Sequence, residues 1–328
     1  MRIAIDAMGG DNAPGCNVEG ALLAAKEWPD TEILLVGDEK ILAPLVKGGP
    51  DNVTIVHAAE VIAADDEPVR AVRRKKDSSM VIAGRLVKEK RADAMISAGN
   101  TGALMATGLL VVGRITGIER PALAQMLPTM GEGGVLVLDL GANMDAAPEH
   151  LVQYAVMGHI FRRKVHGLEK PRVALLNVGT EATKGNELCK AAFPLLSAAP
   201  VHFIGNVEAR DVLEGNCDVL VCDGFAGNIM LKSFEGASGM IFSVLKSEFS
   251  SGLLKKLAAA VVAPGLRSFR KKMDYREYGG APMFGVDGIV IKGHGSSDAL
   301  AIMNAVRQAR IMAASGALEE MAAEINRK

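Results

Sequence analysis

Residues 2–27, RIAIDAMGGDNAPGCNVEGALLAAKE, contain the stretch that decides the fold class. The short apolar run Ile3–Asp6 indicates a buried strand, a pair of glycines indicates a turn, and the spacing of apolar residues over Asn17–Glu27 is typical of a helix. The same order of short strand, glycine-rich turn and longer helix recurs through most of the chain. This alternation predicts a doubly wound α/β fold of three layers, in which a mostly parallel central sheet has helices on both faces.

The other predicted elements continue the alternation. Further strands are predicted at Ile33–Val36, Val53–Val56, Ala94–Ser97, Val135–Leu138, Val173–Val178, Val201–Ile204, Val219–Cys222 and Ile289–Ile291. Further helices are predicted at Ser78–Lys90, Pro148–Val165, Lys184–Leu196 and Ser296–Ala314. The run Ala122–Leu127 could pair with Val135–Leu138 as a local antiparallel excursion. With no internal repeat and no linker, residues 1–328 are predicted to be a single α/β/α domain with a helical hairpin around 250–273.

The overall composition excludes several classes of function. The chain has 328 residues, of which 37 are Lys or Arg and 38 are Asp or Glu, so its formal net charge is −1. Hydrophobic residues at 49% and charged residues at 23% are the balance of a globular protein and exclude intrinsic disorder. A near-neutral chain with 4% aromatic residues has neither the field nor the stacking surface that nucleic acids require. No nucleic-acid partner is expected.

The cysteines and the apolar segments indicate a cytoplasmic location. The four cysteines form no CxxC pair, so neither a disulfide framework nor a structural zinc is expected. The N-terminus reaches Asp6 and a glycine pair too early to contain a signal peptide. The uncharged stretch 94–113 has polar residues and glycines in its middle, so a strand, loop and helix are predicted there instead of a membrane span.

Five strand-to-helix junctions are rich in Gly, Asn, Ser and Thr. They are Asp6–Asp11, Ser97–Gly102, Gly179–Gly185, Asp223–Asn228 and Gly293–Asp298. In open α/β sheets the ligand lies at the carboxyl ends of the strands, so we expect these loops to lie together at one edge. Backbone amides at helix starts would stabilise an anion there. Neither the phosphate-binding loop of nucleotide hydrolases nor a complete dinucleotide fingerprint is present.

Three side chains in these loops are the strongest candidates for catalysis. Lys184 is predicted at the mouth of a helix, where the dipole disfavours a cation, so a role in binding an anion is favoured over a solvated lysine. Asn228 either lines the site or caps the apolar helix that follows it. His294, between two glycines, is either a proton donor or an ordinary turn residue. The loop aspartates would orient Lys184 or bind a metal, and no metal-ligand set is predicted.

Two positive segments could contact partners. The first contains Arg70, Arg73 and Arg74 and is either a solvated helix face or a dock for an acidic protein. In the second, basic residues flank an apolar run that a Pro-Gly pair interrupts, and it suits either an anionic membrane surface or a hairpin buried in a dimer. Its candidate contact residues are Lys255, Lys256, Leu257, Val261, Leu266 and Arg267.

Several motifs together resemble the bacterial phosphate acyltransferases of phospholipid synthesis, the PlsX family. They are IAIDAMGGDNAP, SAGNTGAL, NVGTEATKGNEL, CDGFAGNIMLKSFEG, YGGAPMFG and IKGHGSSD, and they follow one another in the order of that family. The resemblance implies formation of an acyl phosphate from long-chain acyl-carrier protein and inorganic phosphate. It also implies a fold similar to that of the isocitrate and isopropylmalate dehydrogenases and of phosphotransacetylase.

The resemblance also implies partners and site residues. Acyl carrier protein is the expected partner, with a homodimer and peripheral contact with, or coupling to, the membrane glycerol 3-phosphate acyltransferase, and no cofactor is expected. For this chemistry we expect Lys184, Asn228 and His294 to be catalytic: Lys184 holds the phosphate, Asn228 steadies the phosphate or the thioester oxygen, and His294 protonates the departing thiolate. Residues expected to bind phosphate or substrate are Asp6, Gly9, Gly10, Asn100, Thr101, Gly102, Thr183, Gly185, Asp223 and Gly227. The alternatives are a CoA-dependent phosphotransacetylase, a metal- and NAD-dependent dehydrogenase on the same fold, and a non-catalytic scaffold at the membrane surface.

Overall fold

The strands and helices follow the predicted alternation. The computed structural model describes residues 1–131, 133–250 and 279–326 and, between the last two ranges, Gly252, Lys255, Val262, Ala263 and Gly265. The strands are β1 (Arg2–Asp6), β2 (Glu32–Gly37), β3 (Val53–His57), β4 (Ala94–Ser97), β5 (Ala122–Leu127), β6 (Val135–Leu138), β7 (Arg172–Asn177), β8 (His202–Glu208), β9 (Val219–Val221), β10 (Ala281–Phe284) and β11 (Ile289–Lys292). The α-helices are α1 (Gly15–Glu27), α2 (Glu39–Val46), α3 (Pro68–Arg74), α4 (Ser79–Lys88), α5 (Thr101–Thr107), α6 (Pro148–His166), α7 (Glu187–Ala198), α8 (Gly224–Ser250), α10 (Ala299–Ser315) and α11 (Ala317–Ile325). A π-helical turn, η1 (Gly108–Val112), extends α5, and a 3₁₀ turn, η2 (Val212–Glu214), precedes β9.

Within the described residues, the strands form one sheet of eleven in the order β3-β2-β1-β4-β11-β10-β5-β6-β9-β7-β8. The first five strands in this order are mutually parallel and form a first block. The last four, β6, β9, β7 and β8, are also mutually parallel and form a second block. Strands β10 and β5 lie between the two blocks, with antiparallel pairing on both sides of each. The predicted mostly parallel sheet is confirmed, as is the antiparallel pairing of β5 with β6.

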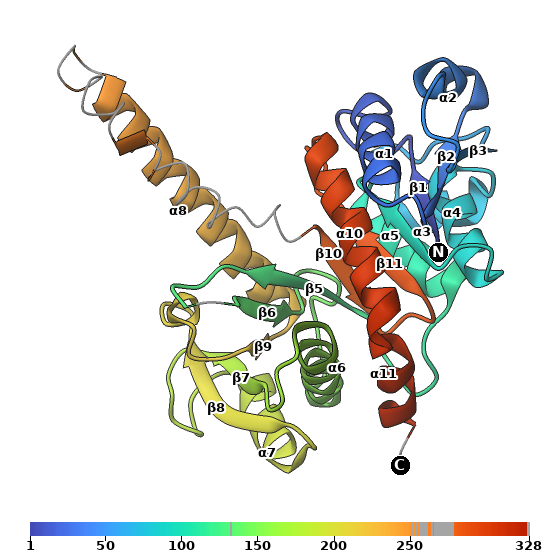
Figure 1. Cartoon of the computed structure of the whole chain (residues 1–328). Helices are drawn as coiled ribbons and strands as arrows, with labels where there is room; N and C mark the ends of the chain where they lie inside the picture. The colour runs from blue at the N-terminus through green and yellow to red at the C-terminus, as the bar shows by residue number, and fades with distance from the viewer. Residues whose placement is uncertain are drawn as a thin grey trace.

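Helices cover both faces of this sheet, because alternate residues of each strand point to opposite sides. Ile3 and Ile5 of β1 pack into a core beneath α1, α6, α7, α10 and α11. Ala4, between them, points to the other face, where α3, α4 and α5 cover the first block. Leu231 of α8 belongs to a third cluster over the second block. The predicted three-layer α/β/α arrangement is therefore confirmed (Figure 1).

The two blocks of strands run in opposite directions, so the expectation that all five candidate loops lie at one edge of the sheet is wrong. Three successive antiparallel pairings separate β11 from β6, so the strands of the second block run against those of the first. The loops after β1, β4 and β11 therefore share the carboxyl edge of the first block, whereas those after β7 and β9 follow strands that point the other way. The five candidate loops do not belong to one parallel edge.

Helix α8 leaves the body of the molecule. Figure 1 shows its first turns against the sheet and its later turns projecting away from both halves. Among its residues only Gly224, Gly227 and Leu231 are buried. The predicted hairpin over 250–273 falls almost entirely outside the described residues, as do Lys256, Leu257, Val261, Leu266 and Arg267. Among the described helices, none combines the length and the hydropathy needed to cross a membrane.

Candidate active site

The loops after β1, β4 and β11 converge at the carboxyl edge of the first block. The amide of Asp11 donates to the carbonyl of Gly295 at 2.8 Å, and the amide of Gly293 donates to the carbonyl of Ser97 at 2.8 Å. At Gly9, a side chain would place its Cβ 2.9 Å from the amide nitrogen of Gly99, so only glycine allows this close approach. Residues far apart in sequence therefore form one continuous surface.

The buried side chain of Asp6 holds the loops of this surface by hydrogen bonds. Its carboxylate is 2% exposed, and it accepts hydrogen bonds from the Ser97 hydroxyl at 2.6 Å and from the Met8 amide at 3.3 Å. Burial raises the pKa of Asp6, which these hydrogen bonds oppose. The buried Asn17 side chain holds the same loop by donating to the carbonyls of Asp6 and Gly9. Asp6 thus supports the loop, and Gly9 and Gly10, whose φ is +110°, allow its shape.

Three residues of the loop after β4 were predicted to bind substrate, and they differ in what they contact. The Asn100 side chain caps α5 by accepting from the Ala103 amide at 3.0 Å, and its amide group donates to the carbonyls of residues 63, 64 and 66. Asn100 is therefore occupied by local structure. At Gly102 an added Cβ would lie 2.6 Å from Pro68 Cγ, so this glycine permits α5 to pack against α3. Thr101 is exposed and lines a cavity.

This cavity, called the polar cavity below, has a volume of about 240 Å³ and lies between the converged loops and one face of α8. Its polar and charged lining residues are Thr101, Gln125, Asn228, Lys232, Glu235, Lys292, His294 and Ser297. Glu235 is its one carboxylate among the described lining residues, and it pairs with Lys232 at 2.7 Å. Two lysines, a histidine and several neutral hydrogen-bonding groups therefore surround a space that suits a small anion.

Sequence reasoning missed Lys232 and Lys292 of this cavity, and Lys292 is the less exposed of the two. It ends β11, and its ammonium donates to the carbonyl of Gly293. Burial lowers the pKa of Lys292 to about 8, although Asp11 and Asp6 act in the opposite direction. The signal in the sequence is a lysine directly after the buried run Ile289–Ile291 and directly before a glycine, where a solvated lysine is not expected.

Asn228 and His294 meet in the polar cavity, as predicted for two members of one site. Asn228 does not cap α8, because the helix begins earlier and the Asp223 carboxylate accepts from the Ala226 amide at 2.6 Å. Within the described part of the chain, the Asn228 amide has no hydrogen-bond partner, so it is available to a ligand. His294 Nδ1 lies 2.8 Å from the Ser296 hydroxyl, and burial lowers the pKa of its imidazole.

Lys184 lies apart from these residues. Helix α7 begins at Glu187 with Asn186 as its cap, so Lys184 precedes the helix by three residues instead of standing at its mouth. The reason is Gly185, whose φ of +100° breaks the helical path between them. Thr183 and Lys184 are exposed, and neither is among the residues that line the polar cavity. Lys184 therefore does not stand at the N-terminal end of the helix dipole, where it was expected.

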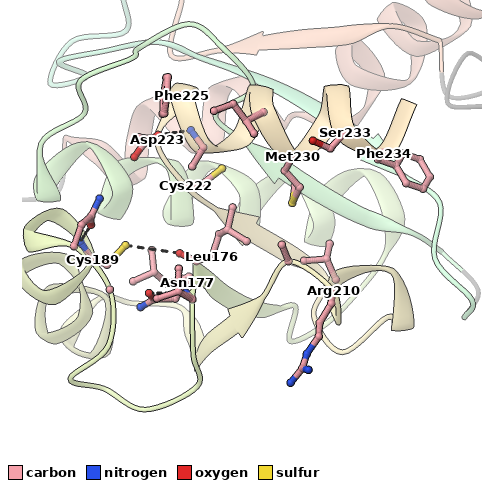
Figure 2. A pocket seen from close by; sticks show the side chains of 18 of the residues that line it. Leu176, Asn177, Cys189, Arg210, Cys222, Asp223, Phe225, Met230, Ser233 and Phe234 are labelled. Carbon is pink, nitrogen blue, oxygen red and sulfur yellow. Dashed lines mark hydrogen bonds between the residues drawn. The ribbon is translucent and has the colours of Figure 1, made fainter. Parts of the chain in front are cut away.

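The loop of Lys184 instead borders a second, larger space, called the apolar cavity below (Figure 2). It has a volume of about 810 Å³ and lies between α7, η2 and the other face of α8. Gly185 and Asp223 line it, and Gly227 lies behind, where an added Cβ would be 2.0 Å from the Asp139 carbonyl. Cys189 and Cys222 also line it, and burial raises the pKa of both thiols, so they are neutral apolar groups and not nucleophiles.

The predicted site is thus divided between the two faces of α8. Thr101, Asn228 and His294 line the polar cavity, while Gly185 and Asp223 line the apolar one. No cluster of three or more His, Cys, Asp or Glu side chains with metal-binding geometry occurs among the described residues.

Of the predicted contact residues, Arg70, Arg73 and Arg74 are exposed on α3. Lys75 next to them is occupied by Asp66 at 2.5 Å. Lys255 pairs with Glu248 of α8. The three arginines form a basic patch near the start of α5, whose first residue lines the polar cavity.

Comparisons with known proteins identify the family to which the chain belongs. A family model described as "Fatty acid synthesis protein" matches residues 1–320. A phosphate acyltransferase from Brevibacillus brevis is 61% identical over 307 residues, covering 93% of this chain and 92% of that protein. Phosphate acyltransferases from Exiguobacterium sp. and Geobacillus thermodenitrificans are 56% and 57% identical, and the alignments cover 98% or more of both chains.

Solved structures share the fold at low sequence identity. A phosphotransacetylase from Streptococcus pyogenes matches with a TM-score of 0.62 and 18% identity, covering 97% of this chain and 94% of that one. The EutD phosphotransacetylase from Staphylococcus aureus matches with a TM-score of 0.59 and 16% identity, covering 95% and 94%. These likenesses show a phosphotransacetylase-like fold. The family model and the close relatives show that the chain is an acyltransferase and belongs to the phosphate acyltransferase family.

Proposed function

We propose that this acyltransferase transfers a long-chain acyl group from acyl-carrier protein to inorganic phosphate. The observation that carries the proposal is the polar cavity, in which Lys232, Lys292 and His294 surround an anion-sized space beside the first turns of α8. Phosphate is the anion in the names of the close relatives. The larger apolar cavity on the other face of the same helix offers space for an acyl chain.

The proposed reaction is a direct displacement. A phosphate oxygen attacks the thioester carbonyl carbon, so a C–O bond forms, the C–S bond breaks, and the electron pair leaves with sulfur. Lys292 and Lys232 hold the phosphate, and the Asn228 amide donates to the carbonyl oxygen as it becomes an oxyanion. His294, whose pKa is lowered by burial, accepts the proton of dihydrogen phosphate and passes it to the departing thiolate.

In this scheme Lys184 acts at the rim of the apolar cavity. Its backbone carbonyl accepts from Asn177 at 3.1 Å, which anchors the loop, while its exposed side chain is free to approach a substrate. We therefore assign Lys184 to the thioester end of the acyl donor, and the polar cavity to the phosphate. The two assignments are separable, since each predicts a different substrate whose KM rises when the lysine is removed.

Acyl carrier protein is the proposed donor and the acyl phosphate is the proposed product. The basic patch Arg70, Arg73 and Arg74 supports an acidic partner that docks beside the polar cavity. No cofactor takes part in the scheme, and full activity after treatment with a chelator is the expected result. A membrane acyltransferase that esterifies glycerol 3-phosphate is the proposed consumer of the product.

The test is release of the carrier-protein thiol from palmitoyl-carrier protein, with and without phosphate, beside the same measurement on palmitoyl-CoA. Phosphate-dependent release from the carrier protein is expected. Release from CoA alone would indicate a CoA-dependent phosphotransacetylase. Release from neither substrate would contradict the proposal and favour a scaffold.

A further inference from the structure

The walls of the apolar cavity are almost entirely hydrocarbon. Its lining includes Leu176, Leu188, Leu213, Ile229, Met230 and Phe234, contributed by β7, α7, η2 and α8. The volume of about 810 Å³ lies within the range of pockets that enclose a small organic ligand. A space this large with apolar walls binds water poorly, because water there has few hydrogen-bond partners.

The few polar groups of the lining are already satisfied by the protein. Asn177 donates to the Lys184 carbonyl at 3.1 Å and accepts from the Val178 amide at 2.8 Å. Asp223 accepts from Ala226 at the start of α8. Arg210 lies between Glu208 and Asp211, at 3.3 and 3.5 Å, and its side chain is 76% exposed. The interior therefore presents few polar groups that a ligand would have to match.

The polar and apolar parts of the lining are arranged along the cavity. Figure 2 shows Asp223 and Asn177 toward one side and Met230, Ser233 and Phe234 toward the other. The first side is where α8 begins and where the loop of Lys184 ends. A ligand that fits this arrangement has one polar, reactive end and a long apolar body.

We propose that the apolar cavity binds the acyl chain of the donor, which passes from the thioester, held beside Asn228 near the start of α8, into the Asn177 and Asp223 end of the cavity and then along α8 past Met230 toward Phe234. The inference rests on the proposed function, whose acyl donor it locates. A chain in this position gains affinity with length, by about fourfold for each buried methylene group. The length of the cavity therefore determines which acyl-chain lengths the enzyme prefers.

The test compares Met230→Trp with Met240→Trp. Both residues are methionines of α8, but Met230 lines the cavity, whereas Met240 lies beyond it and is 64% exposed. In Met230→Trp, kcat/KM for palmitoyl-carrier protein is expected to fall by at least about tenfold, and for butyryl-carrier protein to stay within about twofold. Met240→Trp should leave both values unchanged.

A second cavity variant keeps the test decisive if Met230→Trp fails to fold. Ser233→Phe adds bulk from a side chain that lines the cavity, is exposed and makes no hydrogen bond within the described residues, so the fold should tolerate it. It should produce the same selective loss for palmitoyl. If both cavity variants keep the wild-type ratio of palmitoyl to butyryl activity, the acyl chain does not occupy this cavity.

Failure of the proposed function gives a different result. If wild-type protein releases no thiol from either carrier-protein substrate, direct binding of the fluorescent fatty acid 11-(dansylamino)undecanoic acid decides the inference. Binding that is lost in Met230→Trp and retained in Met240→Trp would support an acyl-chain site without the transfer reaction. Equal binding by both variants, or none by the wild type, would overturn it.

Discussion

Lys292 is half-buried beside a glycine-rich loop, where it loses hydration that the carboxylates of Asp11 and Asp6 do not fully replace. Its lowered pKa, about 8, means that the ammonium of the free enzyme is charged at neutral pH and loses its proton as the pH rises past 8. Asp11 and Asp6 oppose this loss without cancelling it. The charge that we assign to phosphate binding is therefore sensitive to mildly alkaline pH.

The first prediction concerns this titration. If the Lys292 ammonium holds phosphate, kcat/KM for phosphate should fall above pH 8 by about tenfold per pH unit, because this parameter reports the free enzyme. In Lys292→Arg the guanidinium stays protonated, so any remaining activity should lose that alkaline fall. The measurement is kcat/KM for phosphate from pH 6.5 to 9.5. An unchanged alkaline fall in Lys292→Arg would remove Lys292 from the phosphate site.

The second prediction separates Asn228 from Lys184. Asn228→Ala should fold normally and lose about 100- to 1,000-fold in kcat, the usual cost of removing one oxyanion donor. Lys184→Ala should also fold normally, since the side chain is exposed, and should raise KM for the acyl donor more than KM for phosphate. Steady-state kinetics with each substrate varied in turn would decide. If Lys184→Ala raised only the KM for phosphate, the phosphate site would have to be assigned to the loop of Lys184 instead of the polar cavity.

Short motifs allow many single residues of the candidate site to be predicted. They do not predict that these residues are divided between two cavities. Thr101 and His294 meet in one cavity because one starts the helix after β4 and the other follows β11, and Asn228 joins them from the first turns of α8. Lys184, like Asn228, comes after a strand of the second block, but its loop lies toward the other face of α8, and no local pattern in the sequence shows which face a loop reaches. Lys292 was missed because a terminal strand residue has no periodicity of its own.

At the scale of elements, predicted helix starts differ from the observed ones wherever a side chain caps the helix. Asn186 caps α7 and Asp298 caps α10, by accepting from amides three residues later at 2.9 Å. Strand β10 was missed because Pro282 breaks a four-residue run that otherwise has no strand signal. Its pairing with β11 and β5 depends on residues far away in sequence.

The third prediction concerns helix α3. Replacing Arg70, Arg73 and Arg74 by alanine should raise KM for acyl-carrier protein by about tenfold at low salt, because exposed charge pairs contribute about 0.2–1 kcal/mol each. The wild-type KM should rise with ionic strength, and the triple variant should lose most of that dependence. The control replaces three exposed lysines elsewhere, Lys26 of α1 and Lys40 and Lys47 on and beside α2, so that the same number of charges is removed. The same loss in the control would show that net charge, and not this patch, attracts the carrier protein.

At the scale of the whole molecule, α8 is the element least explained by one copy of the chain. Its later turns project from the body, and Ile241 and Val244 are 51% and 62% exposed there. Exposed apolar side chains gathered on one helix are typical of a surface that contacts another protein. A second copy of the chain is the partner that we propose, since two such helices packed together would bury both faces.

The fourth prediction tests this dimer. The wild-type protein should have the mass of a dimer in light scattering after size exclusion, and Ile241→Glu with Val244→Glu should have the mass of a monomer. Burying two glutamates against the same two residues of a second copy costs more free energy than burial of the apolar interface provides. Ser243→Glu is not a suitable control because it lies between them, whereas Leu110→Glu, an exposed position on η1, leaves α8 untouched. A dimer that persists in the double variant would place its interface elsewhere.

The position of β11 in the sheet has a consequence for how the protein is made. Strand β4, at residues 94–97, pairs on one side with β1 and on the other with β11, at residues 289–292. While the ribosome synthesises the chain, β4 therefore has an open edge until residues 289–292 have emerged, and such an edge is prone to wrong pairing. Strand β11 also carries Lys292 and leads into His294. A chain that stops before β11 would therefore lack two residues of the polar cavity, and it would also lack α10, which packs against α1 in the core of the first block.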